Sequence, residues 1–513
     1  MAWVKRLRGA ANHGSVRSQV ASGSVFYRQT AFWGGVGVLL GGVLALAVGC
    51  GNQYRPVITP IQPTGPASQP GAYVTIVSQP GFTPPSASAT APCAGITYPT
   101  PSVISLVDFS GDSIVNEADG GNGPITYSLE AGGANVTAPN CDGTLTTVQA
   151  TTQSLLTKNV QNSTLGLGVD SYATNTMVAG INLYVTQTGP NELSCGATNC
   201  VAQLTGSPEG VKQEIPVAPS LINISGYSIG ERVYAISQGN SNGGAQPAWG
   251  NCANPSSVTV DGEADAIETS TNTVSARLAL GICPVFGFQT PDELRNFVMN
   301  RGSGTVTVIN SQLNALDTTN PNLGPNATIA VSAGPVYADY YRTGQVLVTA
   351  NYDSNTISII DVSLDQYQND STTFGKVLAT VPVGLHPVEL SVLQDGSRVY
   401  VANQGDIASG TAGSVTIVNL SSYTVEKTIA LPAGYYPHAI GSIYNYPIGK
   451  VYVASQNSPY LIVIRTDEDI VTATPEMQGN IVDMHVTAQY PGGATAGQLN
   501  YQTESRSVGS GAP

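Results

Sequence analysis

The stretch VGLHPVELSVLQDGSRVYVANQGD, residues 383–406, decides the fold, because the chain repeats it. About fifty residues later, residues 433–458 read AGYYPHAIGSIYNYPIGKVYVASQNS. Shorter copies stand at 296–310 (NFVMNRGSGTVTVIN) and 345–361 (QVLVTANYDSNTISIID). A marker residue therefore recurs at steps of 51, 52 and 52 residues: Asn300, Asn351, Asn403 and Ser455. Self-similarity at this period predicts a solenoid or a propeller.

Each copy reads as short strands joined by turns. VYVA at 399–402 and VTIV at 415–418 are mostly apolar, β-branched runs, which suit strands covered on both faces. Asn, Gly, Asp and Ser stand between these runs and favour turns. One further strand is expected after each proline and another at 424–431, and no convincing amphipathic helix separates them. Four antiparallel strands in a unit of about 50 residues predict one blade of a β-propeller.

The two ends of the chain are expected to meet in one blade. Innermost strands are predicted to begin near residues 164, 219, 284, 335, 387, 437 and 481, which makes seven. The last of these has no VYVAN-like strand after it. Its expected partner is N-terminal chain, either AYVTIVS at 72–78 or SVISLVDF at 102–109. Such sharing would close the propeller and remove the exposed strand edges of an open array.

The repeat also resembles a known family, the YVTN-type β-propeller repeat. The residues that carry the resemblance are Gly384, Pro387, Asp395, Gly396, the run Val399–Asn403 and the SVTIVN of 414–419. The match is strong over 295–470 and degraded over 160–294. The resemblance implies a seven-bladed propeller in an exported bacterial protein. We therefore predict an all-β fold, with a single propeller of four-stranded blades over residues 72–489.

The first 49 residues have the pattern of an export signal. Five basic residues and no acid lie in residues 1–30, and an apolar run follows from Ala31 to Gly49. The run LAVGC, ending at Cys50, resembles a bacterial lipobox, which implies cleavage before Cys50 and a diacylglycerol group on its thiol. The alternative is an uncleaved membrane anchor, since 19 apolar residues can just cross a bilayer. Both interpretations place the body outside the cytoplasm, and Gly51, where a retention aspartate would stand, favours the outer membrane over the inner one.

Composition and charge limit the possible partners. Residues 50–71 are rich in Pro and predict an extended tether, while the polar, Gly-rich residues 490–513 predict a disordered tail. The formal net charge is −14, and it becomes −19 once the five basic residues of 1–49 are removed. A body this acidic repels phosphate backbones, so nucleic acid is not an expected partner. We expect a monomer held at the membrane by its lipid, with a protein or a glycan of the envelope as its partner.

Six cysteines remain beyond Cys50, and their number and expected compartment predict three disulfides. They are Cys93, Cys141, Cys195, Cys200, Cys252 and Cys283. Fifteen pairings are possible with six cysteines. Pairing between neighbours (93–141, 195–200 and 252–283) is our working hypothesis. No CxxC pair is present, which argues against a zinc site.

Few residues of the sequence are candidates for catalysis or ligand binding. His386, His438 and His485 lie at or just after loops that lead into innermost strands, and they are either a metal-binding or general-base set or three unrelated polar residues. They do not occupy equivalent positions, since His386 precedes its proline and His438 follows its own. Tyr435 and Tyr436, in the loop before Pro437, are either exposed ligand-binding residues or wedges between blades. We therefore name these three histidines and two tyrosines as possible ligand-binding residues.

Other motifs favour structure over chemistry. The stretch DGEADAIE at 261–268 carries four acids, but it lacks the spacing of a calcium loop and is expected to be a solvated loop. No G-x-S-x-G elbow is present, and no serine has a credible histidine and acid partner. We predict no metal and no cofactor.

Three functions are consistent with these patterns. The favoured one is a non-enzymatic binding or scaffolding module on a lipid anchor. The alternative is a propeller enzyme, because propellers of similar repeat include lactonase-like hydrolases and redox proteins with a cofactor at one mouth of the channel. The third is a structural protein of a cell-surface array. Fold alone does not decide among them.

Overall fold

The computed structural model describes the following residues: 73–79, 103–108, 112–114, 126–128, 135–139, 145–149, 173–179, 182–187, 199–206, 209–226, 231–239, 252, 254–341, 344–367, 369–443, 449–455, 457–477 and 480–487. The chain divides into two units, Met1–Arg55 and Pro56–Pro513, and every described residue belongs to the second. The predicted signal, Cys50, the tether and the tail lie outside the described residues. In the described part of the chain, no helix combines the length and the apolar character that a membrane crossing needs.

The all-β prediction is confirmed, since the described residues form antiparallel sheets and two short 3-10 turns, Pro255–Ser257 and Tyr352–Ser354. We number six sheets in chain order and call the seventh the terminal sheet. Their strands are as follows: sheet 1, β7 (Ala173–Ala179), β8 (Asn182–Gln187), β9 (Cys200–Gly206) and β10 (Glu209–Pro216); sheet 2, β11 (Leu221–Gly226), β12 (Arg232–Ser237), β13 (Asp261–Glu268) and β14 (Thr273–Ile282); sheet 3, β15 (Pro284–Gln289), β16 (Arg295–Asn300), β17 (Thr305–Asn310), β18 (Ala315–Leu316) and β19 (Thr328–Ala330).

The remaining sheets follow the same order. They are sheet 4, β20 (Pro335–Tyr341), β21 (Val346–Asn351), β22 (Thr356–Asp361) and β23 (Val377–Pro382); sheet 5, β24 (Pro387–Val392), β25 (Arg398–Asn403), β26 (Ser414–Asn419) and β27 (Thr424–Ala430); sheet 6, β28 (Pro437–Ile443), β29 (Lys450–Ser455), β30 (Ile462–Arg465) and β31 (Ile470–Ala473); and the terminal sheet, β32 (Asn480–Thr487), β1 (Tyr73–Gln79), β2 (Val103–Asp108), β3 (Ser113–Ile114) and β4 (Thr126–Ser128). A separate pair joins β5 (Asn135–Pro139) and β6 (Leu145–Gln149).

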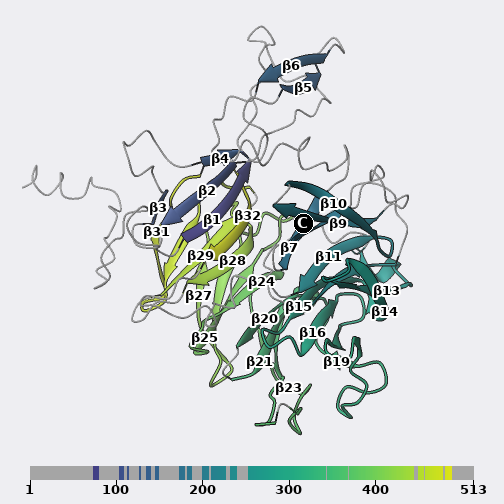
Figure 1. Cartoon of the computed structure of the whole chain (residues 1–513). Coiled ribbons are helices and arrows are strands. Elements are labelled where there is room, and N and C mark those ends of the chain that lie inside the picture. Colours follow the sequence, from purple (N-terminus) through teal and green to yellow (C-terminus); the bar gives the residue numbers. More distant parts are fainter. Residues whose placement is uncertain are drawn as a thin grey trace, which may run out of the picture. The chain divides into compact units, whose positions relative to one another are not determined.

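The first strand of each sheet lies beside the first strand of the next. Contacts run from β7 to β11, β15, β20, β24, β28 and β32 in that order (Figure 1). In the terminal sheet, β1 pairs antiparallel with β32 and β2 pairs with β1, so the 72–78 segment is the direct partner of the C-terminal strand. Val74, Tyr452 and Met484 share one buried cluster, which joins this sheet to sheet 6.

Two expected positions are wrong. The acidic stretch 261–268 is not a solvated loop but strand β13, because Ala264 and Ala266 alternate with its acids and are buried together with Ile267. The first strand of sheet 1 is β7, at Ala173–Ala179, and the segment at 164–169 lies outside the described residues.

The marker residue of the repeat has a structural reason. Asn300, Asn351 and Asn403 each end a second strand and are buried. Their Nδ2 groups donate to hydroxyl groups on the third strand, at 2.8 Å to Thr307, 2.9 Å to Ser358 and 2.9 Å to Thr416. A buried amide must find such partners, so each copy keeps a small hydroxyl residue opposite its asparagine.

A cation joins each of several sheets to the next. The first residue of a second strand reaches the segment after the third strand of the following sheet. The contacts are Arg232 Nη1 to the Ser311 carbonyl (2.6 Å), Arg295 Nη2 to Asp370 (3.0 Å), Arg398 Nη1 to Asp469 (2.7 Å) and Lys450 Nζ to Asp112 (2.6 Å). The last contact gives the terminal sheet the same relation to sheet 6 that sheet 6 has to sheet 5.

Candidate functional site

His386 lies at a fixed position of the repeat, immediately before Pro387, which begins the first strand of sheet 5. Its φ is 54°, in the left-handed region, and Cys283 (56°), Gly334 (76°) and Ser220 (60°) hold the same conformation before β15, β20 and β11. The His386 carbonyl accepts a hydrogen bond from the Gln404 amide at 2.8 Å. The histidine is thus held by the backbone of the repeat, at the edge where second strands end.

The His386 ring is part of a stacked column of side chains. Its ring lies 4.5 Å from the ring of Tyr352, at an angle of 13°. The guanidinium of Arg301 lies 4.9 Å from the Tyr352 centroid, within the range of a cation–π contact. Arg301 and Tyr352 both directly follow marker asparagines, so neighbouring copies of the repeat bring them side by side.

Hydrogen bonds orient the column. Arg301 binds the Asp353 carboxylate through Nε (3.1 Å) and Nη2 (2.9 Å) and donates from Nη1 to the Cys252 carbonyl at 3.0 Å. The Tyr352 hydroxyl contacts Gln404 Oε1 at 3.2 Å, and burial raises the pKa of Tyr352. His386 Nδ1 lies 2.7 Å from the Gly405 carbonyl. Because a carbonyl only accepts, Nδ1 carries the proton, and the Nε2 atom of a neutral His386 is an acceptor.

The other predicted residues are not brought together with His386 into one group. Tyr435 is 4% exposed, and its hydroxyl donates to the carbonyls of Val453 (2.8 Å) and Tyr460 (2.9 Å), so it packs between strands. Tyr436 is half-buried, and its amide contacts Ser455 Oγ at 3.2 Å. His438 is buried in β28. The backbone of His485 lies in β32 opposite Thr75, and its side chain lies outside the described residues.

The disulfides are described in part. Cys252 and Cys283 are bonded, with a Cα–Cα distance of 5.6 Å, which confirms this pair of the neighbour hypothesis. Cys200 is also disulfide-bonded. Cys93, Cys141 and Cys195 lie outside the described residues, so the other two pairings stay predictions. The Arg301 amide donates to the Cys283 carbonyl at 2.8 Å, so the disulfide is next to the stacked column.

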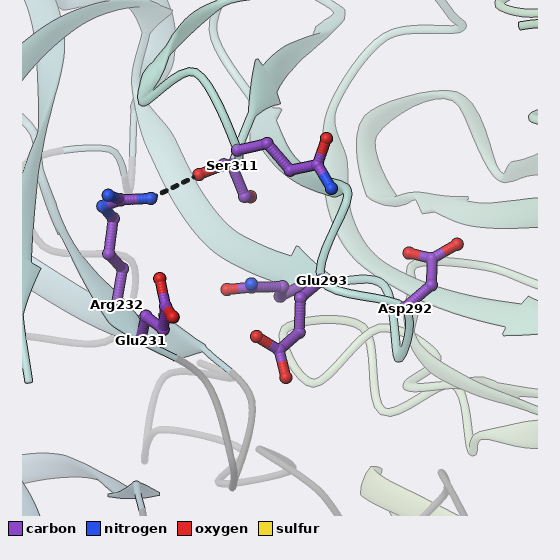
Figure 2. Close-up of a pocket in the computed structure, with 7 residues that line it drawn as sticks. Glu231, Arg232, Asp292, Glu293 and Ser311 are labelled. Carbon is purple, nitrogen blue, oxygen red and sulfur yellow. Dashed lines mark hydrogen bonds between the residues drawn. The ribbon is translucent and has the colours of Figure 1, made fainter. Parts of the chain in front are cut away.

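A polar pocket of about 450 Å³ lies at the opposite ends of the second strands. It is lined by Glu231, Arg232, Gln289, Asp292, Glu293, Ser311 and Gln312. These residues come from the start of β12, from the end of β15 and the connection that follows it, and from the turn after β17. Figure 2 shows Arg232 and Glu231 on one side of the pocket and Asp292 on the other.

A second pocket of about 720 Å³ adjoins the first, because Gln312 lines both. Its walls come mainly from the loops that follow β17 and β22: Leu294, Arg295, Asn310, Gln312, Thr319, Asn320, Pro321, Asn322, Tyr367, Asn369, Asp370, Ser371 and Thr372. Asn322 Nδ2 donates to the Phe374 carbonyl at 2.9 Å, and Asn320 Nδ2 donates to Asp370 at 2.8 Å. These bonds join the two loops into one wall, on which Tyr367 is 75% exposed.

The column and the pockets lie at opposite ends of the same strands. Arg295 begins β16 beside the second pocket, and Asn300 ends it beside Arg301. Six residues of strand separate the two edges by roughly 17 Å. Among the described residues, no group of three or more His, Cys, Asp or Glu is placed to hold a metal ion.

Sequence reasoning missed both pockets and most of the column. Most pocket residues stand in connections that differ from copy to copy, so the repeat does not mark them, although Arg232 and Arg295 occupy the repeated first position of a second strand. Arg301 and Tyr352 did carry a signal, since each follows a marker asparagine at a step of 51 residues. The repeat does not mark the position after the asparagine, because its residue type changes between copies.

Comparisons with known proteins add resemblance of fold only. No protein-family model matches the sequence, and no curated protein matches it. A solved structure of a functionally unknown protein from Desulfotomaculum acetoxidans DSM 771 is similar, with a TM-score of 0.44 and 13% identity over 80% of this chain and 98% of that one. Hydrazine synthase of Kuenenia stuttgartiensis is similar with a TM-score of 0.36 and 15% identity, over 52% of this chain and 70% of that one. Likenesses this distant carry no argument about function.

Proposed function

We propose that this chain is a lipid-anchored, seven-bladed propeller that binds a glycan of the cell envelope without altering it chemically. The observation that carries the proposal is the larger pocket. Its lining is dominated by Asn, Thr, Ser and Asp side chains, with Tyr367 exposed on its wall. Amide and hydroxyl groups exchange hydrogen bonds with sugar hydroxyls, and an exposed tyrosine offers an apolar face to a pyranose ring.

The geometry of the loops supports a preformed site. Arg295 binds Asp370 at 3.0 Å from Nη2 and pairs with Asp317 at 2.6 Å from Nε, so one guanidinium fixes both loops. A site whose walls are already ordered loses less entropy when a ligand binds. The pocket therefore has the properties of a binding surface, and its residues include no obvious nucleophile–base pair.

A glycan array tests the ligand class. We expect a neutral oligosaccharide to bind, and Tyr367→Ala to weaken binding about tenfold. Tyr460→Ala is the matched control, because Tyr460 is 45% exposed on sheet 6 and lies outside the pocket lining. An equal loss of glycan affinity in both variants would contradict the glycan proposal. Binding to a protein but to no glycan would contradict it as well.

The seven-bladed ring rests on the repeated contacts between sheets. Six sheets follow one another through their first strands, and the Lys450–Asp112 pair continues the pattern into the terminal sheet. Closure further requires the terminal sheet to pack against sheet 1. A crystal structure of the mature chain that showed an open array would overturn this part of the proposal.

The anchor rests on the lipobox-like LAVGC and the Pro-rich residues 50–71. We expect expression in a Gram-negative host to yield a chain that begins at Cys50, carries acyl chains and sediments with the outer membrane. Cys50→Ser should keep the signal uncleaved by the lipoprotein peptidase. If the wild-type chain is cleaved at another position and carries no acyl chain, the proposed lipid anchor is contradicted.

The enzyme alternative has one observation in its favour. His386 is oriented through Nδ1, which leaves Nε2 as the ring nitrogen that can act as a base or a metal ligand, as in many metal sites. Metal analysis of the purified protein tests this alternative. A stoichiometric metal lost in His386→Asn would move the functional site to the edge that carries the stacked column.

A further inference from the structure

The larger pocket contains side-chain amides whose orientation is fixed by the hydrogen bonds they already make. Asn322 Nδ2 donates to the carbonyls of Thr372 (3.1 Å) and Phe374 (2.9 Å). Because a carbonyl only accepts, the atom that contacts these two groups must be the nitrogen, and the amide cannot flip. Asn322 is exposed, and its Oδ1 atom accepts no hydrogen bond from the described residues. It is therefore an acceptor that a ligand can reach.

Asn369, on the second loop of the same pocket, is oriented in the same sense. Its Nδ2 group lies 3.3 Å from Asp365 Oδ2, and its backbone amide donates to Asp365 Oδ1 at 2.9 Å. That backbone bond lowers the pKa of Asp365, so the carboxylate is ionised and only accepts. Asn369 is exposed, and its Oδ1 atom also has no partner among the described residues. Each loop thus supplies one exposed amide oxygen.

A third asparagine of the lining has the opposite polarity. Asn310 ends β17, and its Oδ1 atom accepts from the Leu313 amide at 3.0 Å. A backbone N–H only donates, so the bonded atom must be the oxygen and the remaining group is Nδ2. Nδ2 makes no hydrogen bond with the described residues and is not fully enclosed. The pocket therefore combines two fixed acceptors with one fixed donor.

The charges of the pocket exclude an acidic ligand. Arg295 is the one cation of the lining. Its guanidinium already pairs with Asp317 at 2.6 Å and with Asp370 at 3.0 Å, so two carboxylates balance one positive charge. A sugar acid would bring a further carboxylate to this site without a free cation to receive it. The ligand is therefore expected to carry no negative charge.

These requirements identify a functional group. The ligand must offer a donor to the loop oxygens and a separate acceptor to Asn310. An ammonium group has no acceptor, a carboxylate has no donor, and a hydroxyl group holds both on one atom. An N-acetyl group is neutral and places its N–H and its carbonyl on different atoms. Its methyl group also offers an apolar contact to Tyr367, which is 75% exposed.

We propose that the larger pocket selects sugars that carry an N-acetyl group. The amide N–H donates to the oxygens of Asn322 and Asn369, and the acetyl carbonyl accepts from Asn310 Nδ2. This inference rests on the glycan function proposed above. It adds which class of sugar is bound and which residues determine the choice.

Titration calorimetry on the full chain tests the selectivity with three matched trisaccharides. N-acetylated chitotriose is compared with cellotriose, which has the same linkage and a hydroxyl group in place of each acetamido group, and with fully deacetylated chitotriose, which carries ammonium groups. We expect the acetylated trisaccharide to bind about tenfold more tightly than either. Equal affinity for cellotriose would overturn the selectivity. Tighter binding of the ammonium form would overturn it too, because it would indicate simple attraction to an acidic protein.

The glycan array separates this inference from the function on which it rests. If the array shows binding to glycans that lack N-acetyl groups and the acetylated trisaccharide does not bind, the selectivity is wrong and the glycan function stands. If no glycan binds in either experiment, both proposals fail.

Asn310→Asp tests the donor directly. The substitution keeps the shape of the side chain and the bond to the Leu313 amide, but it replaces the Nδ2 donor with an acceptor. We expect the affinity for acetylated chitotriose to fall about tenfold and the affinity for cellotriose to change less than about twofold, so that the preference is lost. If Asn310→Asp keeps the preference, Asn310 is not the donor and the proposal fails.

Asn254→Asp is the matched control. Asn254 is exposed and lies outside the pocket lining, and its Oδ1 atom likewise accepts a hydrogen bond, from Ser256 Oγ at 2.8 Å. The same change of charge at this position should leave the affinity for all three trisaccharides unchanged. An equal loss in Asn254→Asp and Asn310→Asp would assign the effect to net charge and overturn the role of Asn310.

Discussion

The Lys450 ammonium group lies 2.6 Å from the Asp112 carboxylate, although the two residues are 338 positions apart in the sequence. Their side chains are 0% and 4% exposed. The pair joins sheet 6 to the terminal sheet, in the place where Arg398 and Asp469 join sheet 5 to sheet 6. A contact that recurs in the fold is here made between distant parts of the chain.

Breaking this pair should destabilise the protein strongly. Asp112→Ala leaves a buried ammonium group without its counter-ion, which costs about 3–5 kcal/mol of unfolding free energy. The double variant Asp112→Leu/Lys450→Met should recover much of that loss, because it leaves no buried charge. Urea unfolding measures both. Asp467→Ala, in the partly exposed Arg465–Asp467 pair, is the control and should cost about 1 kcal/mol or less. A small effect of Asp112→Ala would show that water reaches the site.

Stability should depend on pH through Asp265. Burial raises the pKa of this carboxyl to about 6, and Glu263 adds to the rise, while the Ala218 amide and Arg277 act against it. The folded state therefore binds the proton more tightly than the unfolded state does, and stability falls as pH rises from about 4 through 6. Asp265→Asn should match the wild type near pH 4 and exceed it by up to about 3 kcal/mol above pH 7. Unfolding curves at both pH values test this. If the difference in stability between Asp265→Asn and the wild type is the same at both pH values, Asp265 is not the titrating group.

Removing the Cys252–Cys283 disulfide should cost about 3–4 kcal/mol, because the bond closes a loop of 31 residues in the unfolded chain. The double variant Cys252→Ala/Cys283→Ala can be compared with the wild type by thermal unfolding. Cys200 also forms a disulfide, so added reductant should lower the Tm of both proteins, but by less in the variant. The same decrease in Tm for both proteins would mean that the Cys252–Cys283 disulfide does not contribute to stability.

The backbone at His386 allows a matched pair of substitutions. Alanine and glycine both remove the ring that stacks on Tyr352, but only glycine adopts the φ of 54° without strain. His386→Gly should therefore be more stable than His386→Ala by about 1 kcal/mol. The equivalent Gly334→Ala should be worse still, because an added Cβ would lie 2.2 Å from Asp353 Oδ2. Equal melting temperatures for the two His386 variants would show that the loop relaxes.

The strands are predictable from the repeat because the residues that stabilise them lie within a single copy. The buried Asn403 amide needs Thr416 on the next strand, and both residues are visible in one unit of sequence. The same logic is wrong at β13, where four acids within eight residues suggest a loop. Asp265 is tolerated in a buried strand because the Ala218 amide donates to it at 2.6 Å and Arg277 lies across the sheet. Neither partner is predictable from the local pattern.

The candidate sites were less predictable for a related reason. His386 was named from the sequence, but its stacking partner Tyr352 belongs to the previous copy, and Arg301 to the one before it. Asn310 became notable only because it lines the larger pocket. Repetition identifies what the copies share, whereas binding sites depend on where the copies differ.

The pairing of β1 with β32 has a consequence for how the molecule is made. A chain that is still leaving the ribosome has its first strand but not its last. Its terminal sheet cannot be completed until synthesis reaches residues 480–487, because β32 is the strand that pairs with β1. We expect proteolysis during biogenesis to attack every truncated chain at its N-terminal strands, so that only full-length molecules survive.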